Sequence, residues 1–213
     1  MERFSIIGDD IALGYLPYLR DVVPKSIELQ GVPPFKFQTG RLSMNGGSSH
    51  RILVNVEKWL VERPANYIAW NCGHYDIKDR VSLADYELNL GKIANRLRTG
   101  TRAPLFWIAS TPIRIDEDRA GMNTAVKEYN KVARGIMERF RITVIDVYST
   151  IVLGIPEYCL QNDGRHMMPR GNELIAEKIW RDITGEVRVK IPDGKQIGLS
   201  ECIESQKRHG SGG

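Results

Sequence analysis

The stretch Ser5-Ile6-Ile7-Gly8-Asp9-Asp10-Ile11-Ala12-Leu13-Gly14-Tyr15 determines how this chain folds. An apolar run ends at Gly8, two carboxylates follow, and a helical pattern of apolar residues begins at once. This order predicts a buried strand that ends in a tight turn into a helix. Helix capping is the simplest role for the two aspartates. In open α/β sheets, however, ligands and catalytic groups gather where strands end, which is where Asp9 and Asp10 stand.

Strands and helices alternate along the rest of the chain. Helices are predicted at 11–23, 50–63, 83–98 and 169–183, and a further helix is expected to be capped by Asn123. Apolar strands are predicted at 25–31, 67–70, 104–110 and 142–147. Strand–helix–strand units favour a parallel sheet with helices on both faces. The chain is therefore expected to form an α/β domain whose polar strand ends converge on one edge of the sheet.

Two segments lie outside this alternation. Residues 32–49 are rich in Pro, Gly and Ser, and they predict a long loop of the kind that is more often functional than idle. Apolar alternation at 187–191 and 196–199 flanks Asp193-Gly194 and predicts a β-hairpin. We therefore expect a domain at 1–184, a hairpin extension at 185–205 and a tail at 206–213, part of which resembles a cloning linker.

Composition predicts an ordinary soluble globular protein. The chain has 213 residues, 42% of them hydrophobic and 26% charged, with a net charge of +4. No stripe of basic and aromatic side chains indicates a nucleic-acid groove, and no apolar run has the length of a membrane span. Three scattered cysteines argue against a disulfide framework, and no signal peptide is visible. We expect a cytoplasmic protein with no nucleic-acid partner, no membrane partner and no cofactor.

Four short blocks follow one another along the chain: Gly8-Asp9-Asp10, the Gly46-Gly47 loop, Asn71-x-Gly73-x-x-Asp76 and Asp163-x-x-His166. Together they resemble the SGNH/GDSL hydrolase family, whose members are esterases, lipases and carbohydrate deacetylases. The resemblance covers residues 3–184. It implies a three-layer α/β/α sandwich with a central parallel sheet, in agreement with the alternation of elements. It also implies a hydrolase that acts on acyl or acetyl esters of a carbohydrate or another small molecule.

The resemblance also assigns roles to residues. His166 would be the general base and Asp163 the carboxylate that orients it, because a nucleophile needs a base within reach and the base needs a fixed tautomer. Gly46 or Gly47 would donate to the developing oxyanion. The family's third-block asparagine is replaced by Tyr75, so Asn71 is expected to take over as the other donor. The residues expected to line the substrate site are Asp9, His74, Tyr75 and Arg165.

Position 10 departs from the family at the nucleophile, because the family has serine there and this chain has Asp10. A carboxyl group with a reference pKa of about 3.9 is ionised at neutral pH and has no proton to give to His166. Four interpretations are open: a deliberate substitution, a natural binding module without turnover, Asp10 itself as nucleophile or base, and a divalent-metal site of Asp10, Asp163 and His166. Ester hydrolysis is accordingly expected to be impaired or altered.

Overall fold

The computed structural model describes residues 1–32, 46–113, 120–152, 154–158, 163–185, 188–190 and 196–198. At its centre lies a five-stranded sheet with the order β2-β1-β3-β4-β5, and every pair of neighbours is parallel. The strands are β1 (Glu2–Ile7), β2 (Ile27–Gln30), β3 (Tyr67–Trp70), β4 (Leu105–Ile108) and β5 (Thr143–Ile145). The predicted parallel sheet is confirmed.

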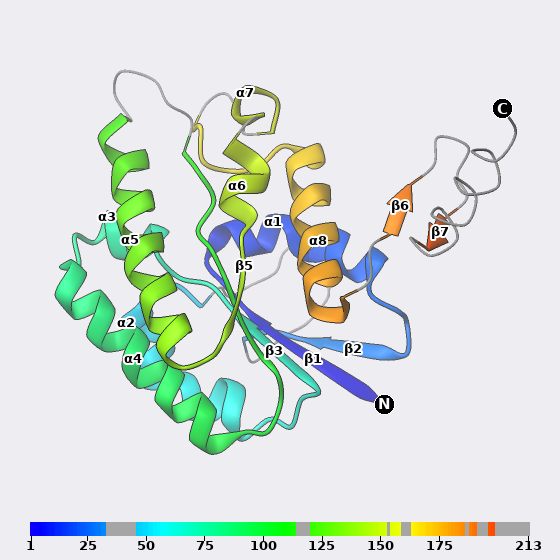
Figure 1. The fold of residues 1–213 in the computed structure, drawn as a ribbon, viewed down its shortest axis with the longest axis horizontal. Helices are drawn as coiled ribbons and strands as arrows, with labels where there is room; N and C mark the ends of the chain where they lie inside the picture. Colours follow the sequence, from blue (N-terminus) through cyan, green and yellow to red (C-terminus); the bar gives the residue numbers. More distant parts are fainter. Residues whose placement is uncertain are drawn as a thin grey trace, which may run out of the picture.

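Helices cover both faces of the sheet (Figure 1). One face carries α1 (Asp10–Val22), α6 (Val147–Val152), α7 (Ile155–Tyr158) and α8 (Pro169–Thr184). The other carries α2 (Ser49–Val56), the π-helical turn η1 (Glu57–Val61), α4 (Leu83–Gly100) and α5 (Ala120–Arg139). The short helix α3 (His74–Lys78) follows β3. This arrangement is the expected three-layer α/β/α sandwich.

The strands divide their side chains between two cores, one under each helical layer. On β3, Ala69 packs on the α1 and α8 side, whereas Ile68 and Trp70 pack on the α4 and α5 side. Trp70 and Trp107 are both fully buried. Because both faces are covered, the central strands carry apolar residues continuously and show no polar alternation, as parallel strands usually do.

The order of the strands places a topological switch point at the carboxyl ends of β1 and β3. The chain runs from β1 to β2 on one side and then to β3 on the other side of β1, so the direction of winding reverses there. Ile7 pairs with Trp70, and the N–H of Asn71 donates to the carbonyl of Ile7 at 2.8 Å. Ligands bind at such switch points in open α/β sheets, so this edge is where a site is expected.

Some local expectations are wrong. Asn123 does not cap a helix, because α5 already begins at Ala120, and the Asn123 Oδ1 instead accepts the N–H of Ile113 at 3.1 Å. The helix predicted at 50–63 consists of α2 followed by the π-helical η1. The short helices α3, α6 and α7 have too few residues to show a helical period, and the sequence did not predict them.

The C-terminal hairpin is present. β6 (Arg188–Lys190) pairs antiparallel with β7 (Gln196–Gly198) in a separate two-stranded sheet. The predicted turn at Asp193-Gly194, most of the predicted loop at 32–49 and the tail at 206–213 lie outside the described residues. Within the described part of the chain, no helix is both long enough and apolar enough to cross a membrane.

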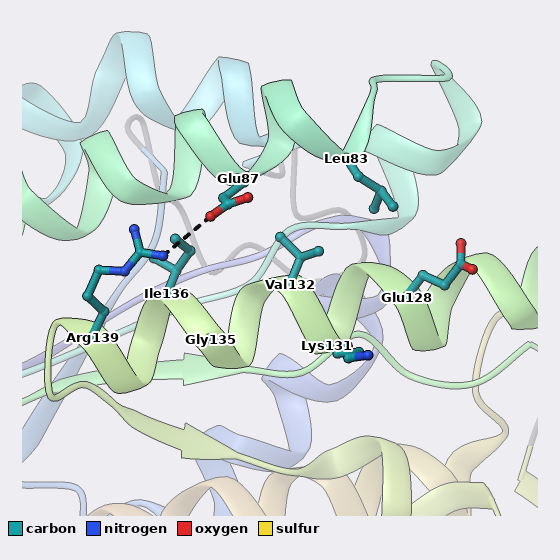
Figure 2. Close-up of a pocket in the computed structure, with 8 residues that line it drawn as sticks. All are labelled: Leu83, Glu87, Glu128, Lys131, Val132, Gly135, Ile136 and Arg139. Carbon is teal, nitrogen blue, oxygen red and sulfur yellow. Dashed lines mark hydrogen bonds and ion pairs between the residues drawn. The ribbon is translucent and has the colours of Figure 1, made fainter.

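A surface groove of about 420 Å³ lies between α4 and α5 (Figure 2). An exposed ion pair bridges it, with Arg139 Nη2 lying 3.4 Å from Glu87 Oε1. Gly135 of α5 lines the groove, and Gly91 lies inside α4. Apart from the adjoining residues and the backbone of the same helix, no heavy atom of the described residues lies within 4 Å of a Cβ added at either glycine. Neither glycine is therefore required by packing.

Gly91→Ala and Gly135→Ala are each expected to raise the free energy of unfolding by about 0.5–1 kcal/mol, because glycine inside a helix is less stable than alanine by that amount. Gly73→Ala is the contrasting variant, since Gly73 has a φ of 146° and a Cβ there would collide with the Ser110 hydroxyl. Urea unfolding followed by circular dichroism measures all three. Helix variants that are no more stable than the parent would contradict the expectation.

Candidate active site

Asp9 and Asp10 stand where β1 passes into α1. Asp9 is the N-cap of α1, and its Oδ1 accepts the N–H of Ile11 at 3.0 Å. The turn is tight enough to require glycine at position 8, because a Cβ there would lie only 2.6 Å from the Cβ of Ala12. Asp10 is the first residue of the helix, where the positive end of the helix dipole favours a carboxylate.

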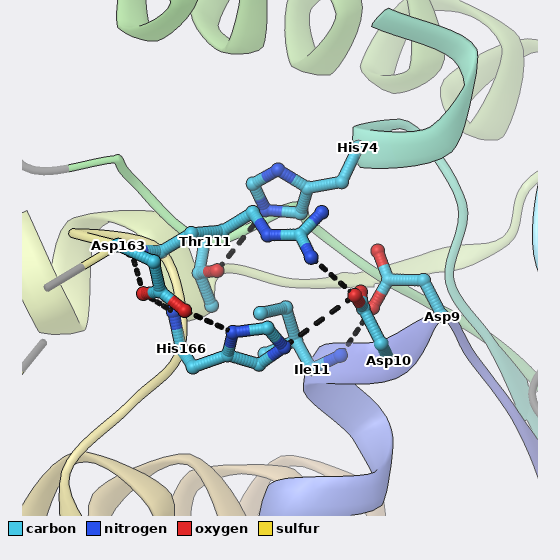
Figure 3. A network of polar contacts seen from close by, with 8 residues as sticks. Asp9, Asp10, Ile11, His74, Thr111, Asp163 and His166 are labelled. Atoms are coloured by element: carbon cyan, nitrogen blue, oxygen red, sulfur yellow. Dashed lines mark hydrogen bonds and ion pairs between the residues drawn. The ribbon is translucent and has the colours of Figure 1, made fainter. Parts of the chain in front are cut away.

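The first and last sequence blocks meet at His166 (Figure 3). The Nδ1 of His166 lies 2.6 Å from Asp163 Oδ2, and its Nε2 lies 3.4 Å from Asp10 Oδ2. Asp163 Oδ1 accepts the backbone N–H groups of Arg165 and His166 at 2.9 and 3.0 Å. The structure thus brings together the three residues that the sequence analysis assigned to catalysis, with the imidazole between two carboxylates.

Both carboxylates favour the protonated form of His166. The hydrogen bond to Asp10, against the opposing effect of burial and with further help from Asp163, raises the pKa of His166 to about 8. Burial alone would raise the pKa of Asp163, but the backbone N–H of Arg165 and the hydrogen bonds of His166 lower it to about 2. At neutral pH the imidazole is therefore a cation held between two anions.

Arg165 adds a second cation on Asp10. Its guanidinium Nη2 donates to Asp10 Oδ2, the same oxygen that faces His166. Burial tends to raise the pKa of Asp10, but His166 and Arg165 outweigh burial and hold this pKa below its ordinary value. Asp10 is consequently an ionised, doubly paired carboxylate, and Arg165, expected to contact substrate, here contacts Asp10.

The proposed oxyanion donors lie close to the turn after β1, and two of the three already make hydrogen bonds. The N–H of Gly46 donates to the Gly8 carbonyl at 2.5 Å, so this group is committed to the fold. Gly47 has a φ of 70°, a conformation that glycine adopts without strain. The Asn71 Nδ2 donates to the Ile108 carbonyl at 2.8 Å, and a primary amide has a second hydrogen to give.

Asp76 ties this loop to α3 as a bracing carboxylate, the role that its sequence favours, although sequence reasoning did not identify its partner Ser49. The Asp76 carboxylate accepts the backbone N–H of Ser49 at 3.1 and 3.0 Å and the Ser49 hydroxyl at 2.6 Å. Asn89 of α4 donates to the same hydroxyl at 3.0 Å. These bonds fix the start of α2, two residues after Gly47. Tyr75 is half-buried beside them, and the Lys78 ammonium lies 5.5 Å from the centre of its ring.

A cluster of buried polar groups lies behind Asp10. Asp9, Tyr15 and His74 line a cavity of about 10 Å³, close to the space that one water molecule needs. Within the described residues, Asp9 Oδ2, the Tyr15 hydroxyl and His74 Nδ1 have no hydrogen-bond partner. The His74 Nε2 lies 3.2 Å from the Thr111 hydroxyl. Tyr15 and Thr111 were not predicted, because a helical tyrosine and a loop threonine carry no motif.

Burial sets the charge of this cluster. Burial and the nearby Asp10 charge raise the pKa of Asp9 to about 7, whereas burial and the Arg165 charge lower that of His74 to about 4. Burial also raises the pKa of the Tyr15 phenol. At neutral pH His74 is therefore uncharged and Asp9 is partly protonated.

A metal site is not formed by these groups. Among the described residues there is no set of three or more His, Cys, Asp or Glu side chains arranged to hold a metal ion. The interpretation of Asp10, Asp163 and His166 as metal ligands therefore gains no support from their arrangement.

Comparison with known proteins identifies the fold. The sequence matches no protein-family model and no curated protein. Among solved structures, a lipase/acylhydrolase from Enterococcus faecalis matches with a TM-score of 0.69 and 20% identity, over 87% of this chain and 96% of that chain. A lipolytic G-D-S-L family protein from Veillonella parvula matches with a TM-score of 0.67 and 21% identity, over 86% and 99%. The chain has the fold of G-D-S-L lipolytic proteins.

An acetylxylan esterase from Geobacillus stearothermophilus has the same fold. It matches with a TM-score of 0.68 and 15% identity, over 85% of this chain and 94% of that chain. The alignment covers nearly all of each of these three structures, so the likeness extends over the whole domain.

Asp9→Asn is expected to remove a pH dependence from folding stability while keeping the cap, since the asparagine oxygen can still accept the N–H of Ile11. The folded-state pKa of Asp9 is raised from 3.8 to about 7. Protonated Asp9 is therefore tolerated at low pH, and the folded protein loses stability as the pH rises from the unfolded-state pKa to the folded-state pKa. Above the folded-state pKa the lost free energy no longer changes with pH.

The variant should thus gain stability over the parent between pH 4 and pH 7, by a few kcal/mol at about 1.4 kcal/mol per pKa unit. Urea unfolding of both proteins across that range measures the difference. Parallel stability curves would contradict the buried, proton-holding role of Asp9.

Proposed function

We propose that the chain carries an ester-hydrolase site in which Asp10 stands in place of the nucleophilic serine and blocks serine-type turnover. One observation carries this proposal: the Nδ1 of His166 faces Asp163 at 2.6 Å while its Nε2 faces position 10 at 3.4 Å. This is the order of orienting acid, base and nucleophile in a catalytic triad. The fold shared with a lipase/acylhydrolase and an acetylxylan esterase supports acyl or acetyl esters as the substrate class.

A hydroxyl at position 10 would complete the mechanism. As the hydroxyl attacked the ester carbonyl, His166 would accept the hydroxyl proton. Asp163 would hold the imidazole in the required tautomer and stabilise the imidazolium. The Gly47 N–H and the second amide hydrogen of Asn71 would stabilise the oxyanion, because the Gly46 N–H is already bonded to Gly8. The substrate proposed here is an acylated carbohydrate or another small ester.

Asp10 prevents the proton transfer and the nucleophilic attack in the chain as it is. It has no proton to transfer, and it holds His166 as an imidazolium that cannot accept one. Asp10 is also a poor base itself, because His166 and Arg165 keep its pKa low. Its Oδ2 faces both cations and its Oδ1 is buried, so neither oxygen is well placed to attack a substrate. These facts weigh against Asp10 as nucleophile or base.

A binding module without turnover is the second candidate. The observation that favours it is the double pairing of Asp10 with Arg165 and His166, which leaves the two cations electrically balanced by Asp10 and Asp163. Such a module would bind an ester or sugar ligand in the same crevice, saturably and without product. Turnover by the Asp10→Ser variant, and not by the parent, separates the two candidates.

The decisive variant is Asp10→Ser, assayed for p-nitrophenyl acetate hydrolysis at pH 8 beside the parent. We expect a gain of about 100-fold or more, the usual contribution of a positioned general base, and a burst of nitrophenol. Asp10→Asn is the matched control, because it removes the charge without supplying a hydroxyl, and it should stay at the parent level. The double variant Asp10→Ser, His166→Ala should lose the gain.

Other outcomes would reject the proposal. A parent that outpaces Asp10→Ser would make Asp10 itself the reacting group. A gain that survives His166→Ala would remove His166 from the mechanism. A folded Asp10→Ser protein that stays silent would favour the binding module.

A further inference from the structure

A pocket of about 300 Å³ opens beside the triad. Asp163, Arg165 and His74 form the wall that it shares with the catalytic site, and Lys78 of α3 stands in its lining as well. A group bound in the pocket would therefore lie next to His166. Volumes near this size are typical of sites for small molecules.

The charges around the pocket leave one positive charge in excess at neutral pH. The Asp163 carboxylate is engaged through both oxygens and is balanced by His166. Arg165 is balanced by Asp10. His74 is neutral because burial lowers its pKa. In the described part of the chain, the Lys78 ammonium contacts the Tyr75 ring and forms no ion pair with a carboxylate.

Arg165 already binds a carboxylate in this setting, because its guanidinium donates to Asp10 Oδ2. A guanidinium has five N–H donors and commonly takes two acceptor oxygens at once. The Arg165 side chain is 23% exposed, so part of it is accessible from solvent. The pocket thus offers a partly exposed guanidinium and an ammonium to an incoming anion.

The remaining lining is apolar. Ile77, Ile113 and Met122 contribute it, and Met122 is 42% exposed although it is a large hydrophobic residue. Covering such surface with an aliphatic segment is favourable, at about 25 cal/mol per Å² of apolar area removed from water. A sugar acid would instead place hydroxyl groups against these apolar side chains, so it would not gain the same free energy.

We propose that this pocket binds an anionic group at the end of an aliphatic segment, with Lys78 and Arg165 holding the anion. Resting on the proposed function, this inference makes the preferred substrate an ester whose acyl part bears a carboxylate, as in a monoester of an aliphatic dicarboxylic acid. Lys78 is then a specificity-determining residue for the same site.

The test measures binding to the unaltered protein, with the methyl groups of its Ile and Met residues labelled for NMR. Sodium hexanoate, hexanamide and sodium glucuronate are titrated separately. We expect hexanoate to shift the signals of Ile77, Ile113 and Met122 saturably, with a Kd at least 10-fold lower than that of either other probe. Lys78→Gln should raise the hexanoate Kd about 2- to 5-fold, as for other exposed ion pairs. Lys92→Gln, an exposed α4 lysine outside the pocket, should not.

Three results would overturn the inference. Hexanamide binding as tightly as hexanoate would remove the anion preference, and tighter binding of glucuronate would make the ligand an acidic sugar. If none of the probes shifted the methyl signals of Ile77, Ile113 or Met122, the pocket would bind none of them. Because binding needs neither a nucleophile nor turnover, these results are independent of Asp10→Ser activity, and failure of that variant would leave the pocket test unaffected.

Discussion

The interaction on which the site depends is the imidazole of His166 held between the carboxylates of Asp10 and Asp163. It joins the start of α1 to the loop before α8, two segments at opposite ends of the domain's sequence. Arg165 belongs to the same loop and closes onto the same oxygen of Asp10. With a carboxylate at position 10 this arrangement is a charge-balanced network. Under the proposed function, a hydroxyl there would make the same geometry a catalytic triad.

The fold brings these segments together by packing α1 and α8 side by side on one face of the sheet (Figure 1). Gly14 makes this close approach possible, because a Cβ there would lie 2.8 Å from Asn172 Oδ1 on α8. Asn172 in turn donates to the Met167 carbonyl at 3.1 Å, directly after His166. The Gly8 turn at one end and this contact at the other set the position of Asp10 relative to His166.

The fold could be predicted because it depends on local patterns, whereas the meeting of Asp10, Asp163 and His166 was expected from the family resemblance. Short apolar runs that end at Gly8, Asn71 and Ser110 mark buried parallel strands, and the Asp163-x-x-His166 block is one of the four on which the resemblance rests. The Asp9–Tyr15–His74 cluster and the Ser49–Asp76 bonds depend on which loops meet in space. Sequence periodicity does not record such meetings, so these contacts were missed. Asn123 was misjudged for the same reason, since its partner Ile113 is ten residues away.

The most direct measurement is the protonation state of His166 in the unaltered protein, from the ¹⁵N NMR signals of its imidazole, assigned by their loss in His166→Gln. If Asp10 holds this histidine as a cation, both ring nitrogens carry a proton at pH 7 and the ring loses one of the two near pH 8, since the pKa of His166 is raised to about 8. A neutral ring with one bare nitrogen at pH 7 would contradict that coupling. It would leave His166 free to act as a base beside Asp10.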